Sequence, residues 1–259
     1  IRAVSNPDTL QRYYQGGLRT VQVGVEALSS SLLKKMVKGT RAIENIAVIK
    51  LCAQYGIQLE GNLITEFPGS TEEEVAETLD TLDYVLPFPA LQPATFFLGY
   101  GSPVHKDSKN FGIQAVLPHP KNSRLYPTQY IQSLTMIVNA YRGDRKKQRL
   151  LWKPVKNKIS AWHRFHQQRT DKSLSPLHFR DGGTFLIIRQ EGINSLPLQH
   201  RLRGLSRRIY LYCEIPRDIV DILNNFHGLG EQPLRKFIAE MCTKRLMFQE
   251  DDRAISLAI

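Results

Sequence analysis

Cysteine is scarce in this 259-residue chain, which contains three. Cys52, Cys213 and Cys242 lie far apart in apolar surroundings, so we expect reduced, buried thiols. Their spacing fits neither a disulfide nor a metal site. A cluster held by one loop needs three closely spaced thiolates, and the chain lacks that motif. We therefore expect no metal ligands in this chain.

Long apolar segments are also absent. No run has the roughly 18 consecutive apolar residues that a transmembrane helix needs, and the amino terminus lacks the layout of a signal peptide. We therefore expect no membrane partner and a cytoplasmic location. The chain does not begin with Met, and we interpret it as a fragment or a processed protein.

Acidic residues are outnumbered, with 24 Asp and Glu against 35 Lys and Arg, so the net charge is +11. This balance permits binding of nucleic acid or of an acidic peptide. The positive charge is concentrated in residues 142–149, 153–158 and 201–208. Without a base-stacking motif beside them, we interpret these runs as solvated helix faces or loops. Nucleic acid is not an expected partner.

Two short strands with one polar face each organise the first hundred residues. Residues 20–26 place valine at every second position, and residues 58–64 alternate in the same way. A period of two predicts a strand with one apolar and one polar face. We expect both polar faces to point into an interior. The polar face carries Gln22, Gly24 and Glu26 in the first strand and Gln58, Glu60 and Asn62 in the second.

Helical segments connect these strands and follow them. Residues 30–37 and 41–55 have apolar residues at helical spacing, and residues 70–74 form a capping box that opens another helix. Connections of this length predict parallel strand pairing. We also expect strands at residues 1–4 and 91–98, and a helix that begins after Asn6.

Several motifs together resemble the second half of a radical S-adenosylmethionine (SAM) barrel. The subfamily that the chain resembles is that of the cobalamin-binding radical SAM proteins that mature ribosomally made peptides. The resemblance is strong in about the first half of the chain. The motifs are residues 21–29, 33–40, 62–64 and 67–69, continued by 101–107, 111–113 and 125–127.

This resemblance implies a SAM site at the carboxyl ends of the strands. Glu26 and Gln22 would meet the polar parts of SAM, and Asn62 would help to hold it. The turn after the second strand would shape the adenine pocket. Alternatively, these polar residues bond to one another or face solvent. The implied cofactor-binding residues are Gln22, Gly24, Glu26, Asn62, Phe67 and Pro68.

The chain departs from the family pattern at several positions. Glu66 stands where the family usually has Gly, and Ser70 stands where it usually has Glu. A carboxylate at position 66 is expected to crowd or repel the cofactor carboxylate. His163 and His166 are spaced to share a metal ion, but without a third ligand we assign them a packing or surface role. His105 is a better functional candidate, although a lone loop histidine is usually solvated.

The resemblance also implies cofactors and partners that this chain alone does not supply. The intact enzyme would carry a 4Fe-4S cluster and cobalamin, neither with ligands here. The chain would begin near the third barrel strand and need its amino-terminal half or another subunit. Its partner would be a precursor peptide, and the modification would include C-methylation. The catalytic residues stay unknown, and the alternative is a non-catalytic peptide-binding or scaffold remnant.

The chain divides into three predicted regions. Residues 1–130 form the second half of the barrel with a long loop over its mouth, residues 131–169 form packing helices, and residues 170–259 form a small α+β unit that resembles a winged helix. The helical spacing predicts one helix at 127–141 and another at 153–168, and residues 181–183 are expected to form a turn. The overall class is α/β. In the last unit we expect a strand at 209–213 that accepts a peptide leader. Helices follow at 217–226 and 232–245, and then comes a hairpin at 247–257 whose acidic tip disfavours DNA.

Overall fold

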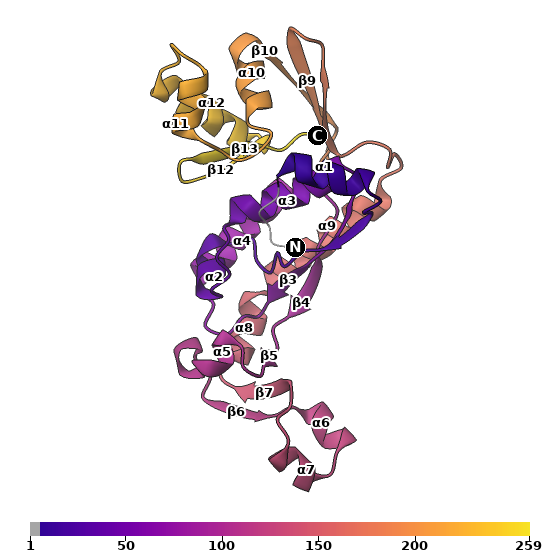
Figure 1. Cartoon of the computed structure of the whole chain (residues 1–259), viewed down its shortest axis with the longest axis vertical. Helices are drawn as coiled ribbons and strands as arrows, with labels where there is room; N and C mark the ends of the chain where they lie inside the picture. Colours follow the sequence, from indigo (N-terminus) through magenta and orange to yellow (C-terminus); the bar gives the residue numbers. More distant parts are fainter. Residues whose placement is uncertain (1–5) are drawn as a thin grey trace.

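Parallel strands form the centre of the amino-terminal part in the computed structural model, which describes residues 6–259 (Figure 1). β1 (Thr20–Gln22) pairs in parallel with β2 (Gln58–Glu60), and β3 (Asn62–Thr65) pairs in parallel with β4 (Gln92–Thr95). Gly61 alone separates β2 from β3, so this segment lies as one bent strand between its two neighbours. The predicted mixed α/β architecture is confirmed. No barrel closes among the described residues, and the strand expected at 1–4 lies outside them.

The connecting helices begin where the capping signals predict. α1 (Pro7–Gln15) follows Asn6, whose side-chain oxygen accepts a hydrogen bond from the Asp8 backbone N–H at 2.9 Å. α2 (Ser30–Lys35) and α3 (Ala42–Gln54) link β1 to β2. α4 (Glu72–Val85) opens with the expected capping box, here between Thr71 and Glu74.

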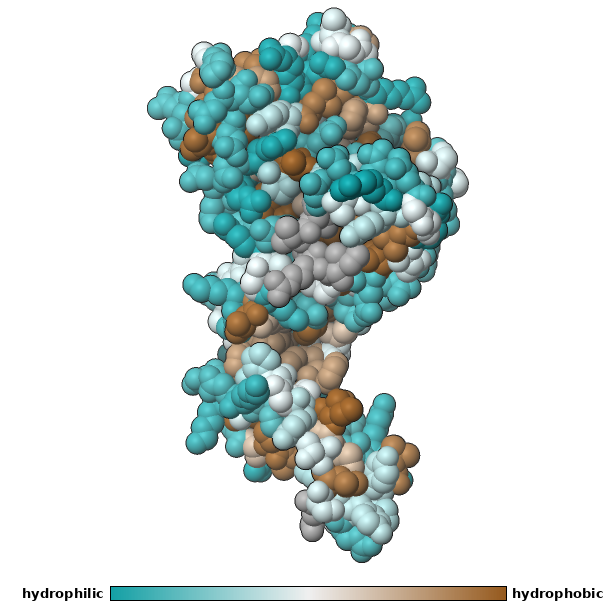
Figure 2. Space-filling view, viewed as in Figure 1, coloured by the Kyte–Doolittle hydropathy of each residue, from teal (hydrophilic) through white to brown (hydrophobic). Residues whose placement is uncertain are grey.

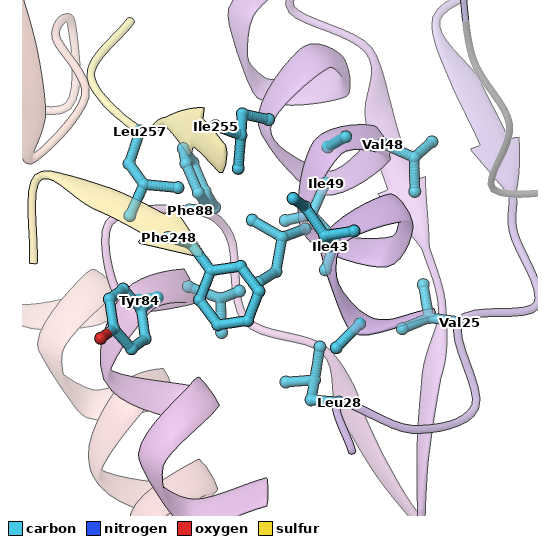
Figure 3. Close-up of a cluster of buried hydrophobic side chains, with 14 of the residues drawn as sticks. Val25, Leu28, Ile43, Val48, Ile49, Tyr84, Phe88, Phe248, Ile255 and Leu257 are labelled. Atoms are coloured by element: carbon cyan, nitrogen blue, oxygen red, sulfur yellow. The ribbon is translucent and has the colours of Figure 1, made fainter. Parts of the chain in front are cut away.

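α3 is buried on nearly all sides. Ten of its thirteen residues are buried, including Ile43, Val48 and Ile49. Figure 3 shows Val25 on the strand side of this helix and Ile255 of the carboxyl-terminal hairpin on the other side. A helix without a solvated face belongs in the middle of a core. The amino- and carboxyl-terminal parts therefore share one hydrophobic core through α3.

A buried lysine joins these two parts. Lys50 on α3 has no exposed surface, and its Nζ donates hydrogen bonds to the carbonyl oxygens of Glu214 and Ser256, each at 2.8 Å. Burial disfavours the charged form and lowers the pKa of Lys50 from 10.5 to about 8. The two carbonyls accept a bond from the amine in either protonation state.

Residues 98–142 form a narrow distal lobe built on a small antiparallel sheet. The expected mouth loop contains short helices and strands instead of irregular backbone. The expected helix over residues 127–141 is wrong in its second half, because the residues before Arg142 pair as a strand with residues 115–118. Figure 2 shows separate brown patches among the hydrophilic side chains of this lobe, in which Leu125 and Ile137 are highly exposed. Its elements are β5 (Leu98–Gly99), α5 (Pro103–Lys106), the 3-10 helix η1 (Ser108–Phe111), β6 (Ala115–Pro118), α6 (Pro120–Leu125), α7 (Thr128–Ser133) and β7 (Val138–Arg142).

Two helices return the chain from the distal lobe. α8 (Arg145–Leu151) leads into α9 (Lys153–Gln168), whose bounds match the predicted helix. α9 packs against α4, and its Trp162 indole N–H donates to the carbonyl oxygens of Leu86 at 3.1 Å and Phe88 at 2.8 Å. These bonds hold α9 against the segment that leads into β4.

The carboxyl-terminal part begins with an antiparallel sheet. β8 (Leu177–Asp181), β9 (Phe185–Gln190) and β10 (Leu198–Arg203) lie in the order β10-β9-β8. The predicted turn at 181–183 is confirmed. The predicted strand at 209–213 is wrong, because this aromatic-rich run belongs to α10 (Gly204–Tyr212), which buries Ile209 and Tyr210. No strand edge exists there for a peptide leader.

The last elements alternate short strands with helices. The expected helices and the terminal hairpin are present, with the strand order β11-β13-β12. The hairpin tip does not project freely, since Glu250 accepts a hydrogen bond from the Ile43 N–H at 3.1 Å and Asp251 pairs with Arg41. The elements are β11 (Arg217–Asp218), α11 (Ile219–Asn225), α12 (Glu231–Thr243), β12 (Met247–Glu250) and β13 (Arg253–Ser256).

Among residues 6–259, no helix combines the length and the apolar character needed to cross a membrane.

Replacing Lys50 with Met is expected to change how the free energy of unfolding depends on pH. The folded-state pKa of about 8 lies below the ordinary 10.5, so the unfolded chain binds more protons between these values. The wild type therefore gains stability as the pH rises through this window, by about 3 kcal/mol. Lys50→Met lacks this gain.

Urea denaturation below pH 8 and near pH 10.5 measures the difference. Lys146→Met, at an exposed position, serves as the control and is expected to follow the wild type. Parallel pH curves for the wild type and Lys50→Met would contradict the assignment.

Candidate functional site

A polar cavity of about 790 Å³ lies on the uncovered face of the parallel strands. The strands place it there because Val21, Val23 and Val25 are buried on their other face. Gln22, Gly24 and Asn62 are correspondingly exposed on the cavity side. The predicted polar face is therefore present, and it faces an open cavity. The polar side chains of the lining are Gln22, Glu26, Gln58, Glu60, Asn62 and Gln92.

Glu26 is held in place by its backbone and by a cation. Its φ of 61° lies in the left-handed region, which is uncommon for a residue other than glycine. Its Oε1 lies 3.1 Å from the Lys38 Nζ. The same oxygen lies 3.3 Å from the position that a Cβ on residue 24 would occupy. Gly24 thus leaves room for the carboxylate over the strand.

A second, more apolar pocket of about 300 Å³ adjoins this cavity. Glu26 and Asn62 line both spaces, and Phe67 lines the second. The Phe67 ring is buried and makes edge contacts with Phe96 and Phe111 at centroid distances of 5.1 and 5.7 Å. This arrangement joins a polar space to an apolar one through two shared residues.

The turn after β3 fixes the position of Phe67. Ser70 Oγ donates to the Phe67 carbonyl at 2.7 Å, and Gly69 takes a φ of 70°. Pro68 is buried in this turn and lines neither of the two spaces. Of the six residues predicted for cofactor binding, four line the larger cavity, Phe67 lines the smaller pocket and Pro68 lines neither.

Glu66 does not point at the cavity as a free carboxylate. It forms an ion pair with Lys156 of α9, and its side chain is 12% exposed. Its φ of 59° is again left-handed, a conformation that glycine adopts without steric cost. The carboxylate that was expected to repel the cofactor is thus neutralised by a helix that packs nearby.

The histidines named from the sequence have structural partners. His163 and His166 contact the carbonyl oxygens of Leu91 and Leu86 through Nε2, at 3.0 and 2.8 Å. Burial lowers the pKa of His166, so its neutral form donates this bond near neutral pH. In the described part of the chain no three His, Cys, Asp or Glu residues group to hold a metal. His105 lies against the Tyr100 ring at 4.9 Å.

The cysteines lie in separate elements and are poor metal ligands. Cys52 and Cys213 are buried, and Cys242 is partly buried. Burial raises the pKa of Cys52 and Cys242 to about 11 and that of Cys213 to about 12. Metal ligation requires the thiolate, which burial disfavours. These residues do not fit an iron–sulfur cluster.

The predicted cofactor-binding set omitted other residues of the site. The period of two placed Gln58 and Glu60 on the polar face with Asn62, and both line the cavity, but neither was assigned to the cofactor. Gln92 lies on β4 opposite Asn62, a pairing that follows once the strand register is known. Lys38 lies in the turn after α2, and no local pattern identified it as the partner of Glu26.

Comparison with known proteins gives limited similarity. No family model matches the chain. Over 65 residues it is 34% identical to an uncharacterized methyltransferase of Pyrococcus horikoshii, which covers 25% of this chain and 14% of that protein. The solved structure of the archaeal Methanocaldococcus infernus Elp3 with an N-terminal deletion aligns with 78% of this chain and 55% of that chain, at a TM-score of 0.38 and 16% identity.

The matched regions span less than two thirds of either relative, and a TM-score of 0.38 is too low to assign a shared fold. The sequence similarity to a protein named a methyltransferase agrees with the methylation that the resemblance implies. The assignment to a peptide-maturing subfamily gains no support from these two relatives.

Anaerobic reconstitution with iron and sulfide is expected to leave this chain without a cluster, because the three thiols are separate and largely buried. Iron and acid-labile sulfide analysis measures the content. Cys242→Ser is the control, and it is expected to retain the same background iron as the wild type. Near-stoichiometric iron that is lost in Cys242→Ser, together with SAM cleavage, contradicts the expectation.

Proposed function

We propose that this chain is part of a radical SAM protein and that it binds SAM on the open face of the parallel strands. The observation that carries the proposal is that a polar cavity and an apolar pocket adjoin each other, with Glu26 and Asn62 lining both. SAM has a charged amino-acid end and an aromatic base, and it needs both environments. The sequence similarity to a methyltransferase supports SAM use.

The residues present fit SAM by size and by charge. The larger space, about 790 Å³, lies within the range of roughly 300–1,000 Å³ typical of small-molecule sites. Glu26 and Glu60 supply carboxylates toward the ammonium and sulfonium groups, and Gln22 and Asn62 supply amide donors and acceptors. Phe67 supplies an apolar wall for the base. Bound SAM supplies a methyl group or a precursor of the deoxyadenosyl radical.

The finer assignment is to maturation of a ribosomally made peptide, including C-methylation. It rests on the resemblance of residues 21–29, 62–64 and 67–69 to that subfamily. In this proposal the 4Fe-4S cluster and cobalamin are held by a part of the enzyme other than residues 1–259 or by another subunit, and the partner is a precursor peptide. The carboxyl-terminal unit acts as a winged-helix-like module. Its order of short strand, two helices and hairpin supports this reading.

A second candidate function is a non-catalytic peptide-binding or scaffold protein. The separate, largely buried cysteines favour it, because the chain alone cannot hold the cluster that radical chemistry needs. The two candidates differ in SAM binding, which the scaffold does not require.

Calorimetry with SAM tests the proposed site. Glu26→Gln is expected to lower the affinity at least about tenfold, because a hydrogen bond to a charged group contributes roughly 1.5–3 kcal/mol. Asn62→Ala is expected to weaken binding less, and Gly24→Ala to weaken it by displacing the Glu26 carboxylate.

Glu240→Gln, on the exposed face of α12, is the matched control and is expected to bind as the wild type does. Absence of SAM binding by the folded wild type removes the proposed function. Equal affinity in Glu26→Gln and the wild type removes Glu26 from the site.

A further inference from the structure

One face of the antiparallel sheet β8–β10 is lined with arginine. The strand register places Ile187 between Arg180 and Arg201, and places Arg203 opposite Phe185. Side chains two residues apart on a strand share a face, so Arg189 joins them. We call this surface the arginine face. It consists of Arg180, Arg189, Arg201 and Arg203 around Phe185 and Ile187.

The arginine face is turned to solvent. The alternate residues of the same strands, including Leu186, Ile188 and Leu202, are buried in the core. All four arginines are exposed, while Phe185 and Ile187 are half-buried. The sheet therefore has one face in the core and one face free to bind a partner (Figure 1).

None of the four guanidinium groups forms an ion pair within residues 6–259. Arg201 lies over the Phe185 ring at 4.6 Å. Nearby cations are paired, as Arg207 is with Asp181 and Arg169 with Glu191. Like charges on adjacent strands repel one another and lower stability. A group of four unpaired arginines is complementary to a polyanion, and the planar guanidinium suits carboxylate or phosphate.

An unpaired strand edge adjoins this face. β10 is the outermost strand, and its outer backbone groups have no backbone partner among the described residues. The opposite edge is closed, because the Ile259 N–H donates to the Leu177 carbonyl and the Phe179 N–H donates to the Ile259 carbonyl, at 3.2 and 3.1 Å. An extended peptide can add to an open edge through main-chain hydrogen bonds.

The arrangement favours a peptide over a nucleic acid. Single-stranded nucleic acids are usually held by basic grooves in which bases stack on aromatic rings. Here the Phe185 ring is covered by the Arg201 guanidinium. The open β10 edge, in contrast, offers the main-chain bonds that a peptide needs.

We propose that the β10 edge and the arginine face bind an extended acidic peptide segment. Its main chain pairs with β10 and its alternate carboxylates meet Arg201 and Arg203, while Arg189 and Arg180 on the next two strands add positive potential. The proposal rests on the proposed function in one respect, that the substrate is a peptide. It assigns the docking site to this sheet, away from the SAM cavity.

Fluorescence anisotropy with a labelled Glu-Val repeat peptide tests this site on the full chain. The double variant Arg201→Glu/Arg203→Glu is expected to bind at least about tenfold more weakly at physiological salt, since two attractions become repulsions. Arg149→Glu, an exposed and unpaired arginine on α8, is the matched control and is expected to bind within about twofold of the wild type. Arg201→Gln/Arg203→Gln supplies a milder variant if charge reversal impairs folding, which circular dichroism monitors.

Two peptides, one N-methylated at odd positions and one at even positions, test strand addition. The peptide whose methylated N–H groups face the β10 edge is expected to lose binding. Equal binding by the wild type and by a folded double variant overturns the proposal. So does binding of oligothymidylate without binding of the peptide. SAM calorimetry on the same protein separates the two proposals, because peptide binding without SAM binding removes the proposed function alone.

Discussion

The two-sided burial of α3 is the constraint on which the other elements depend. A helix with apolar residues around its whole circumference needs a partner on each side. The valines of the first strand cover one side, and the hairpin residues Phe248 and Ile255 contribute to the other. Lys50 can be buried there because the turn and strand that close the core present two carbonyl oxygens to its amine.

This constraint leaves the opposite face of the parallel strands uncovered. The helices pack on the valine side, so the alternate polar residues line a cavity. The strand ends are then shaped by two glutamates in left-handed conformation, Glu26 and Glu66. Such conformations cost energy and often occur at functional sites. Each of these two glutamates has a lysine partner, Lys38 or Lys156, so both carboxylates are neutralised where the strands end.

Local pattern predicted the elements whose own residues carry a clear period or capping signal. The period of two, the capping box and the helical spacing identified β1, α4 and α9, and the polar positions of the site followed from the same alternation. The segments 127–141 and 209–213 were mispredicted because their short apolar and aromatic runs suit either structure. Tertiary contacts decided both, through pairing with residues 115–118 and through packing of α10 into the core. Ion pairs such as Glu66–Lys156 join residues 90 apart, and no local signal reveals them.

The net charge of +11 is distributed unevenly. Some charged side chains are paired within the chain, and others are left unpaired at the surface. The acidic hairpin tip, whose charge the sequence analysis interpreted as disfavouring DNA, is paired with cations: Asp251 with Arg41 and Asp252 with Arg235. Its charge holds the carboxyl-terminal hairpin to the rest of the chain, so it says little about which ligand binds. Within residues 6–259 the four arginines of the arginine face form no ion pair. A carboxylate acts on one of them only from a distance, since hydrogen bonds from Ser173 are the main cause of the lowered pKa of Asp171 and the charge of Arg189 adds to it. Runs of basic residues that look alike in the sequence therefore differ in whether carboxylates pair with them in the fold. The unpaired arginines mark the surface that a negatively charged partner would neutralise.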